Sequence, residues 1–292
     1  MVIVTGEVAG PALWRVTRGN NTLWILPVFG PLPDRLQWKS REVEEVIRNS
    51  QAVYVAGRTV AAASSRSVAR AQRALMNGDG KLLLEMLPAD LYQQFSELSR
   101  RHAGNTSRFE LYRPYYAAEL LREAAMSRLG LASDGEVVAR VTSLARRHGV
   151  KVHAIEAIAP GTKDRIITQL QRTPREADVP CARMLLERME QDLRESIERA
   201  NAWSRGDLAV LRGYAGFRDT PLYRAACAPF LQHMSAMNQQ DAAARRSMYS
   251  TYAGALRRNR STLALVWVSE LLNPDGLGDR FRKAGYQVIE PR

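Results

Sequence analysis

The residue types that carry most enzyme chemistry are few in this chain, and their spacing brings none of them together. Its four histidines are His102, His148, His153 and His233. The first two fall at the ends of predicted helices, where a histidine suits the helix dipole. No serine stands in a Gly-x-Ser-x-Gly turn, and no glycine-rich phosphate loop is present. Spacing alone therefore identifies no nucleophile, metal centre or nucleotide site.

The two cysteines leave two interpretations open. Cys181 and Cys227 belong to no Cys-x-x-Cys or Cys/His cluster, so the sequence does not predict a zinc site. They could form one disulfide or remain two separate buried thiols, and their spacing favours neither interpretation.

Composition narrows the class of protein. The chain has 292 residues, of which 46% are hydrophobic, enough for a substantial core in one large domain or two small ones. No apolar run reaches the roughly 18 residues of a transmembrane helix. Residues 1–7 lack the pattern of a signal peptide, which indicates either a cytoplasmic protein or a chain that starts after a removed export signal.

The charge is strongly positive. Lysine and arginine number 42 against 30 acidic residues, a net charge of +12, which attracts anionic polymers and anionic lipid. The basic residues are spread over many predicted helices, with no basic-aromatic motif of an RNA-binding sheet. This distribution favours a generally basic surface over a specific nucleic-acid site.

The elements that would position any site are strands at the two ends of the chain and helices between them. Residues 13–18 and 22–28 predict a β-hairpin around Gly19-Asn20-Asn21, because apolar and β-branched residues flank a turn sequence. The second of these strands is apolar on both faces, which is typical of a strand inside a covered sheet. Strands are also predicted over 51–55, 150–156, 261–268 and 286–289.

Helical spacing dominates the rest. We expect one domain over residues 1–292, a mixed α/β fold in which βαβ-type terminal units form a central mixed sheet. A mostly helical block is predicted over residues 160–259.

Several segments, in this order, resemble the TraB/GumN family, which is related to the Tiki, erythromycin esterase and ChaN-like proteins. The segments are Ala12-Leu13-Trp14-Arg15-Val16, Thr22-Leu23-Trp24-Ile25-Leu26, residues 84–95, Arg113-Pro114-Tyr115, residues 145–156, residues 199–207, Pro274-Asp275-Gly276-Leu277 and Gly285-Tyr286-Gln287-Val288. The resemblance covers nearly the whole chain and implies a metal-dependent hydrolase or peptidase scaffold.

The chain departs from the family pattern at the places that would hold a metal. The first motif histidine of the family falls at Gly30 and its glycine at Pro27, and the closing histidine falls at Glu270. The glutamate after the middle strand is kept as Glu156. Two carboxylates without further ligands make a poor metal site.

With these departures, the resemblance implies first a pseudoenzyme, a catalytically degenerate protein of the cell envelope. Such a protein would act by binding an unknown protein or an anionic polymer or lipid. It needs no cofactor. The alternative is a hydrolase or peptidase with an altered site on Glu156 and Glu270, the two candidate cleft residues, which would bind a divalent metal only if the site has been rebuilt. A weaker alternative is a basic polyanion-binding protein.

The resemblance also bears on location and on the cysteines. Similar proteins are generally exported, so a periplasmic or secreted protein is expected, and an oxidising compartment permits disulfides. On this ground we expect Cys181 and Cys227 to be bonded to each other.

Overall fold

A six-stranded mixed sheet forms the centre of the protein. The computed structural model describes residues 7–8, 12–33, 37–38, 41–57, 65–132, 135–156, 162–213, 220–228, 245–272 and 275–291. In spatial order the strands of the sheet are β10 (Gln287–Ile289), β2 (Trp14–Arg18), β3 (Asn21–Val28), β9 (Ser261–Trp267), β6 (Ala52–Gly57) and β8 (Lys151–Glu156). Strands β3, β9, β6 and β8 are parallel neighbours, and β2 and β10 continue the sheet by antiparallel pairing beyond β3. The predicted mixed α/β fold is confirmed.

The two ends of the chain interleave within this sheet. The predicted hairpin is present as β2 and β3, with Trp14 opposite Ile25 and Arg18 opposite Asn21. Helix α1 (Arg41–Arg48) then leads to β6, which runs parallel to β3. The two strands are not neighbours, however, because β9 from the far end of the chain lies between them. Five consecutive residues of β9 are buried, as a strand covered on both faces requires.

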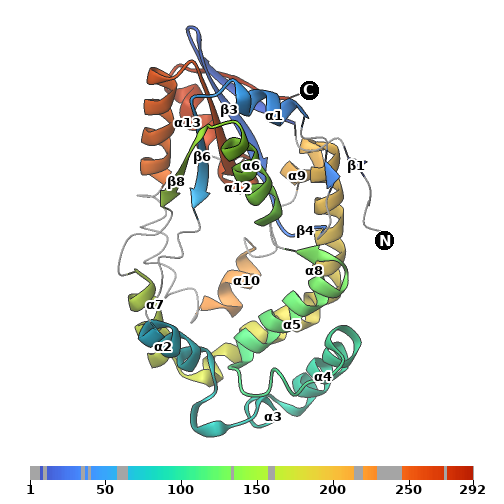
Figure 1. Ribbon diagram of the computed structural model, residues 1–292. Helices are drawn as coiled ribbons and strands as arrows, with labels where there is room; N and C mark the ends of the chain where they lie inside the picture. The colour runs from blue at the N-terminus through green and yellow to red at the C-terminus, as the bar shows by residue number, and fades with distance from the viewer. Residues whose placement is uncertain are drawn as a thin grey trace.

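Helices cover both faces of the sheet (Figure 1). The side chains of each strand alternate between these two layers. On one face, Leu26 packs in a large core that includes residues of α1 and α6 (Gly135–Arg147). On the other face, Ile25 packs in a second core with Tyr252 of the helical residues 245–258 and Phe281 of α13 (Leu277–Lys283). The strand that the sequence predicted to be apolar on both faces is therefore central.

The remaining helices form a block beyond the carboxyl ends of the parallel strands (Figure 1). Its longest member, α8 (Val179–Arg205), has proline in its first turn and ends at Gly206, whose φ of 72° favours glycine. Helices from before residue 160 pack on α8, so the block is not built from residues 160–259 alone. Its other helices are α2 (Ser65–Leu75), α3 (Leu83–Met86), α4 (Ala89–Ala103), α5 (Pro114–Arg128), α7 (Thr162–Arg172), α9 (Leu208–Gly213) and α10 (Pro221–Ala226).

Short elements complete the described fold. Two-residue strands pair as β1 (Glu7–Val8) with β5 (Gln37–Trp38) and β4 (Leu32–Pro33) with β7 (Leu131–Ala132), and 3-10 turns cover Gly78–Gly80 and Arg175–Asp178. The sequence also predicts helices over residues 222–237 and 241–258, of which residues 229–237 and 241–244 lie outside the described residues. None of the helices that the structure describes has the length and apolar character needed to cross a bilayer.

A buried hydrogen bond attaches the helical block to the sheet. The indole Nε1 of Trp203, in the last turns of α8, donates to the carbonyl oxygen of Pro27 at 3.0 Å. The Trp203 side chain is completely buried, and Pro27 lies in β3 just before the edge where that strand ends. This contact holds α8 against the carboxyl edge of the sheet.

We expect Trp203→Phe to destabilise the fold by about 1–3 kcal/mol, because it leaves a buried carbonyl without its donor and removes ring volume. Urea unfolding measures the loss in the free energy of unfolding, provided that the variant and the parent protein have the same m-value. The matched control is Trp24→Phe, which removes the same ring atoms at a half-buried position in β3, the strand that contains Pro27. Equal losses for the two variants would show that the Pro27 hydrogen bond contributes nothing particular.

Candidate site at the carboxyl edge of the sheet

The positions that the family resemblance marked lie along one edge of the sheet. Gly30 follows the end of β3, Glu156 is the last residue of β8, and Glu270 lies in α12 (Val268–Leu272), which begins directly after β9. Because β3, β9, β6 and β8 are parallel, their carboxyl ends meet at this edge. Open α/β sheets usually place their binding sites there.

The two candidate carboxylates are not on neighbouring strands. Strand β6 lies between β9, which leads to Glu270, and β8, which ends at Glu156. The backbones of β9 and β8 are therefore about 10 Å apart across the sheet. Glu156 pairs through its backbone with Gly57 at the end of β6. Its side chain lies outside what the structure describes, so a role for Glu156 stays a prediction.

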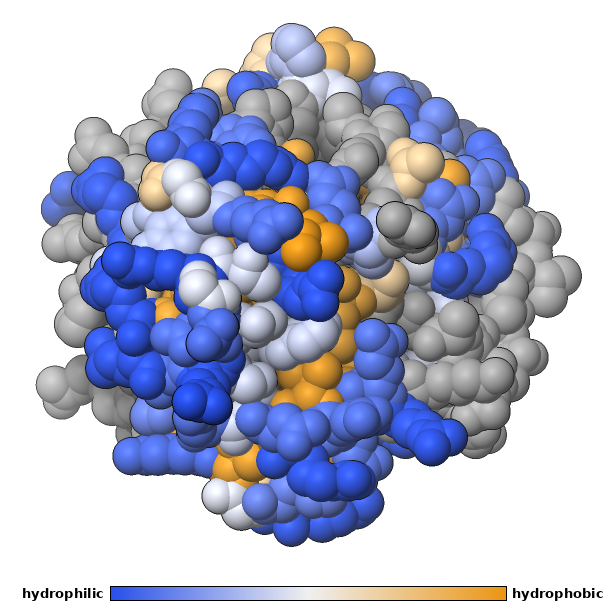
Figure 2. Space-filling model, turned by 90° about the horizontal axis from the view of Figure 1, so that it is seen from above, coloured by the Kyte–Doolittle hydropathy of each residue, from blue (hydrophilic) through white to orange (hydrophobic). Residues whose placement is uncertain are grey.

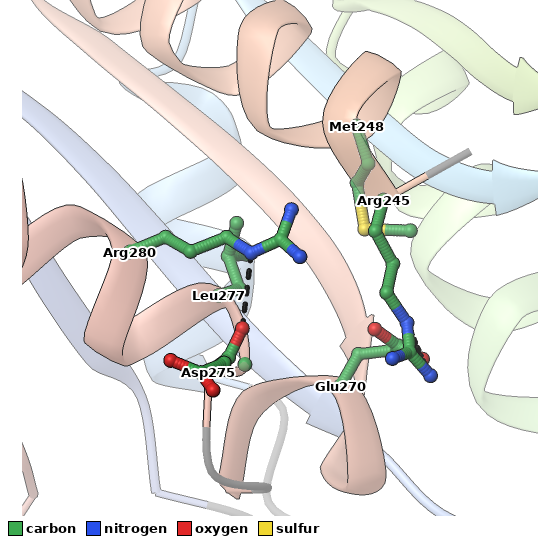
Figure 3. A pocket seen from close by; sticks show the side chains of 7 residues that line it. Arg245, Met248, Glu270, Asp275, Leu277 and Arg280 are labelled. Carbon is green, nitrogen blue, oxygen red and sulfur yellow. Dashed lines mark hydrogen bonds and ion pairs between the residues drawn. The ribbon is translucent and has the colours of Figure 1, made fainter. Parts of the chain in front are cut away.

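Glu270 is held in an ion pair. Its Oε1 accepts from Nε of Arg245 at 3.0 Å and is 2.9 Å from Nη2 of the same guanidinium. Arg245 opens the described part of the helix over residues 245–258, which packs on the face of the sheet beside α12 (Figure 3). The Glu270 side chain is 21% exposed, so this carboxylate is partly withdrawn from water and neutralised by arginine.

A shallow pocket open to solvent lies beside this ion pair, with a cavity volume of about 10 Å³, room for about one water molecule (Figure 3). Across the pocket from Arg245, Nε of Arg280 donates to the backbone carbonyl of Asp275 at 3.0 Å. The Asp275 carboxylate pairs with Lys283, and that ammonium lowers the pKa of Asp275. The lining residues are Arg245, Met248, Glu270, Asp275, Gly276, Leu277 and Arg280.

The charges that line the pocket balance, with Arg245 and Arg280 on one side and Glu270 and Asp275 on the other. Both carboxylates are already paired, Glu270 with Arg245 and Asp275 with Lys283, which lies outside the lining. Within the described part of the chain, no three histidine, cysteine, aspartate or glutamate side chains converge as a metal-ligand group. Because both carboxylates are neutralised by basic side chains, the arrangement suits an anion better than a cation.

The histidines serve other contacts. Nε2 of His102 lies 3.0 Å from Glu190, and Nε2 of His148 lies 2.8 Å from Glu44. The hydrogen bond from His148 lowers the pKa of Glu44. His153 stacks on the ring of Tyr54, with the centroids 4.9 Å apart. His233 lies outside the described residues.

The expected disulfide is present. Cys181 in the first turn of α8 is bonded to Cys227, which directly follows α10, and both cysteines are completely buried. This crosslink ties α10 to α8 within the helical block. No described cysteine is left as a free thiol.

Sequence reasoning missed the partners at the candidate site. Arg245 stands in a basic pair with Arg246, like other arginine pairs along the chain, and no motif marks Arg245 or Arg280 as a site residue. The available signal for Arg245 was its place in a helix directly before the last central strand, because such a helix packs against the strand that follows it. Nothing in the spacing connects Arg245 with Glu270, which is 25 residues away.

Figure 2 shows a described surface that is mostly hydrophilic when the molecule is seen from above, with apolar residues in narrow areas between polar ones. This agrees with the net charge of +12 spread along the whole sequence. The described part of this face therefore presents no broad apolar area of the kind that marks a protein-docking surface.

Comparison with known proteins gave a match to a family. Searches of curated proteins and of solved structures found no match. The sequence model of the TraB/PrgY/gumN family matches residues 12–290, from the first strand of the hairpin to the residue after the last strand. The chain therefore belongs to the TraB/PrgY/gumN family.

Proposed function

We propose that this chain is a catalytically degenerate member of its family that acts in the cell envelope by binding. The observation that carries this proposal is the ion pair between Glu270 and Arg245. Glu270 stands where the resemblance places the closing histidine of the family. A guanidinium at hydrogen-bonding distance from this carboxylate occupies the place that a divalent cation would need.

Electrostatics make the rebuilding of a metal site here costly. A cation approaching Glu270 would have to displace Arg245 and would then face Arg245 and Arg280 across a small pocket. Metal-assisted hydrolysis also needs several ligands on one ion and an open position for water. Glu270 and Asp275 are the described carboxylates that line this pocket, and both are already paired, with Arg245 and Lys283.

The envelope location is supported by the buried disulfide. Disulfides persist in oxidising compartments such as the periplasm and are rare in reducing ones. The bond between Cys181 and Cys227 therefore favours an exported protein. The positive net charge is compatible with a partner that is an anionic polymer or lipid of the envelope.

The alternative is a metal-dependent hydrolase or peptidase that uses Glu156 and Glu270. The placement of both residues at the carboxyl edge of the parallel strands is what favours it. In that enzyme Arg245 would have to leave Glu270 when the metal enters.

Metal loading separates the two functions. We expect protein purified without chelator to carry substoichiometric Mn and Zn, measured by elemental analysis, and to show no rise in melting temperature when either ion is added. Glu270→Ala should leave this behaviour unchanged, as should the control Ser269→Ala at the exposed neighbouring position. One metal per chain that is lost in Glu270→Ala and kept in Ser269→Ala would overturn the proposal in favour of the hydrolase.

A further inference from the structure

Two arginines from different elements leave hydrogen-bond donors directed at the same pocket. A guanidinium carries five N–H groups in a planar fork. Arg280 uses its Nε on the carbonyl of Asp275, and Arg245 uses Nε and Nη2 on a single oxygen of Glu270. Both Nη nitrogens of Arg280, and Nη1 of Arg245, have no acceptor among the described residues.

The two guanidiniums are held in place by their surroundings. Arg245 comes from the helix over residues 245–258 and Arg280 from α13, and both line the pocket. Figure 3 shows Arg280 extending past Leu277 toward the side on which Met248 and Arg245 lie. Met248 and Leu277, both buried, line the pocket together with the two arginines.

We propose that this pocket binds a compact oxyanion, the carboxylate or phosphate group of a ligand, between Arg245 and Arg280. Guanidinium is the side chain best suited to planar, bidentate recognition of these groups. The contact between Arg245 and Glu270 already shows that Arg245 binds a carboxylate at the pocket, supplied by the chain itself. The inference rests on the proposed binding function and names the chemical class of its ligand.

Glu270 has a defined part in this site. Its carboxylate competes with the ligand for Arg245, so it weakens anion binding. Asp275 does not compete in the same way, because its carboxylate is paired with Lys283 outside the two arginines. Removing the charge of Glu270 should therefore strengthen the binding of an anion, whereas it would weaken the binding of a metal ion.

The experiment titrates the whole chain with inorganic phosphate and, in a separate arm, with acetate, at constant ionic strength by calorimetry. The variants are Arg280→Gln, Glu270→Gln and the control Arg246→Gln, which removes an exposed arginine next to Arg245. We expect Arg280→Gln to weaken binding about tenfold and Glu270→Gln to strengthen it several-fold, since loss or gain of one charge-assisted pair is of this size. Arg246→Gln should have no effect.

Arg280→Gln and Glu270→Gln are expected to change the affinity for the anion in opposite directions, so the inference can be refuted. Equal affinities for Arg280→Gln and Arg246→Gln would mean that anions bind the basic surface generally and would overturn the site. So would an unchanged or weaker affinity in Glu270→Gln. Arg280→Lys, which retains the charge, guards against a folding defect and should bind more weakly than the parent and more tightly than Arg280→Gln.

The two titration arms identify the ligand group, since tighter binding of phosphate or of acetate assigns the site to that anion. Failure here is distinct from failure of the proposed function. A chain that carries no metal but shows no response to Glu270→Gln loses only the anion site. A chain with stoichiometric metal loses the degenerate-enzyme proposal first.

Discussion

Replacing Asp178 by alanine is expected to cost the fold about 3–5 kcal/mol, the loss typical of a buried charge left without its partner. The side chains of Asp178 and Arg113 are both completely buried. Nε of Arg113 donates to Oδ2 of Asp178 at 2.5 Å, and Nη2 donates to Oδ1 at 2.7 Å. Without Asp178, the guanidinium would remain in the interior with its charge uncompensated.

The consequence should extend over four helices, because Arg113 connects them. Its Nη1 donates to the carbonyl oxygens of Leu170 in α7 at 2.9 Å and Ala74 in α2 at 3.3 Å. Arg113 itself directly precedes α5, and Asp178 directly precedes α8. Burial, followed by repulsion from Arg113, also lowers the pKa of the neighbouring Arg175. The pair therefore fixes the junction at which α2, α5, α7 and α8 meet.

Urea unfolding of Asp178→Ala, Arg113→Met and the double variant Arg113→Met with Asp178→Leu tests this account. Each single replacement should be strongly destabilising, whereas the double variant, which leaves no buried charge, should recover most of the loss. The control is Asp279→Asn, which removes an ion pair with Arg282 in which both side chains are 42% exposed. That change should cost less than about 1 kcal/mol. A double variant as unstable as the sum of the singles would show that the two side chains are not coupled and would contradict this account.

Local pattern was sufficient to predict the strands and most of the helices. The alternation around Gly19-Asn20-Asn21 predicted the hairpin, and the apolar run over residues 261–268 predicted the buried strand β9. The stop of α8 at Gly206 could also be predicted, since glycine adopts the positive φ found there. These features depend on residues near one another in the sequence.

Features that join distant parts of the chain could not be predicted in this way. The place of β9 between β3 and β6 depends on pairing between residues more than 200 positions apart. Arg113 was part of a segment marked by the family resemblance, but its partner Asp178 lies 65 positions away. Period-two and helical patterns report which face of an element is buried and carry no information about which element covers it.

The candidate site shows the same difference between features set by nearby residues and contacts between distant ones. The resemblance located Gly30, Glu156 and Glu270 as positions of interest, and the parallel strands do bring their backbones to one edge. The resemblance assigned Glu270 no partner, whereas the structure pairs it with Arg245. Helix packing on the sheet determines that contact, and no motif encodes it.

Loss of the disulfide should be comparable in size to loss of Asp178. The bond between Cys181 and Cys227 closes a loop with a sequence separation of 46, which in the chain-entropy account stabilises the folded state by about 4 kcal/mol. Cys181→Ala with Cys227→Ala should therefore lower the urea midpoint strongly. Reduction of the parent protein should produce most of the same shift, because it removes the same constraint from the unfolded chain.

The position of the crosslink explains why other contacts would not replace it. Helix α10 has only six residues, too few to be stable alone, and its Tyr223 and the adjacent Cys227 are its buried contacts with the block. Reductant should have no effect on the double alanine variant, which serves as the control for nonspecific effects of the reagent. Two titratable thiols in the unreduced, denatured protein would contradict the disulfide and, with it, the main support for an envelope location.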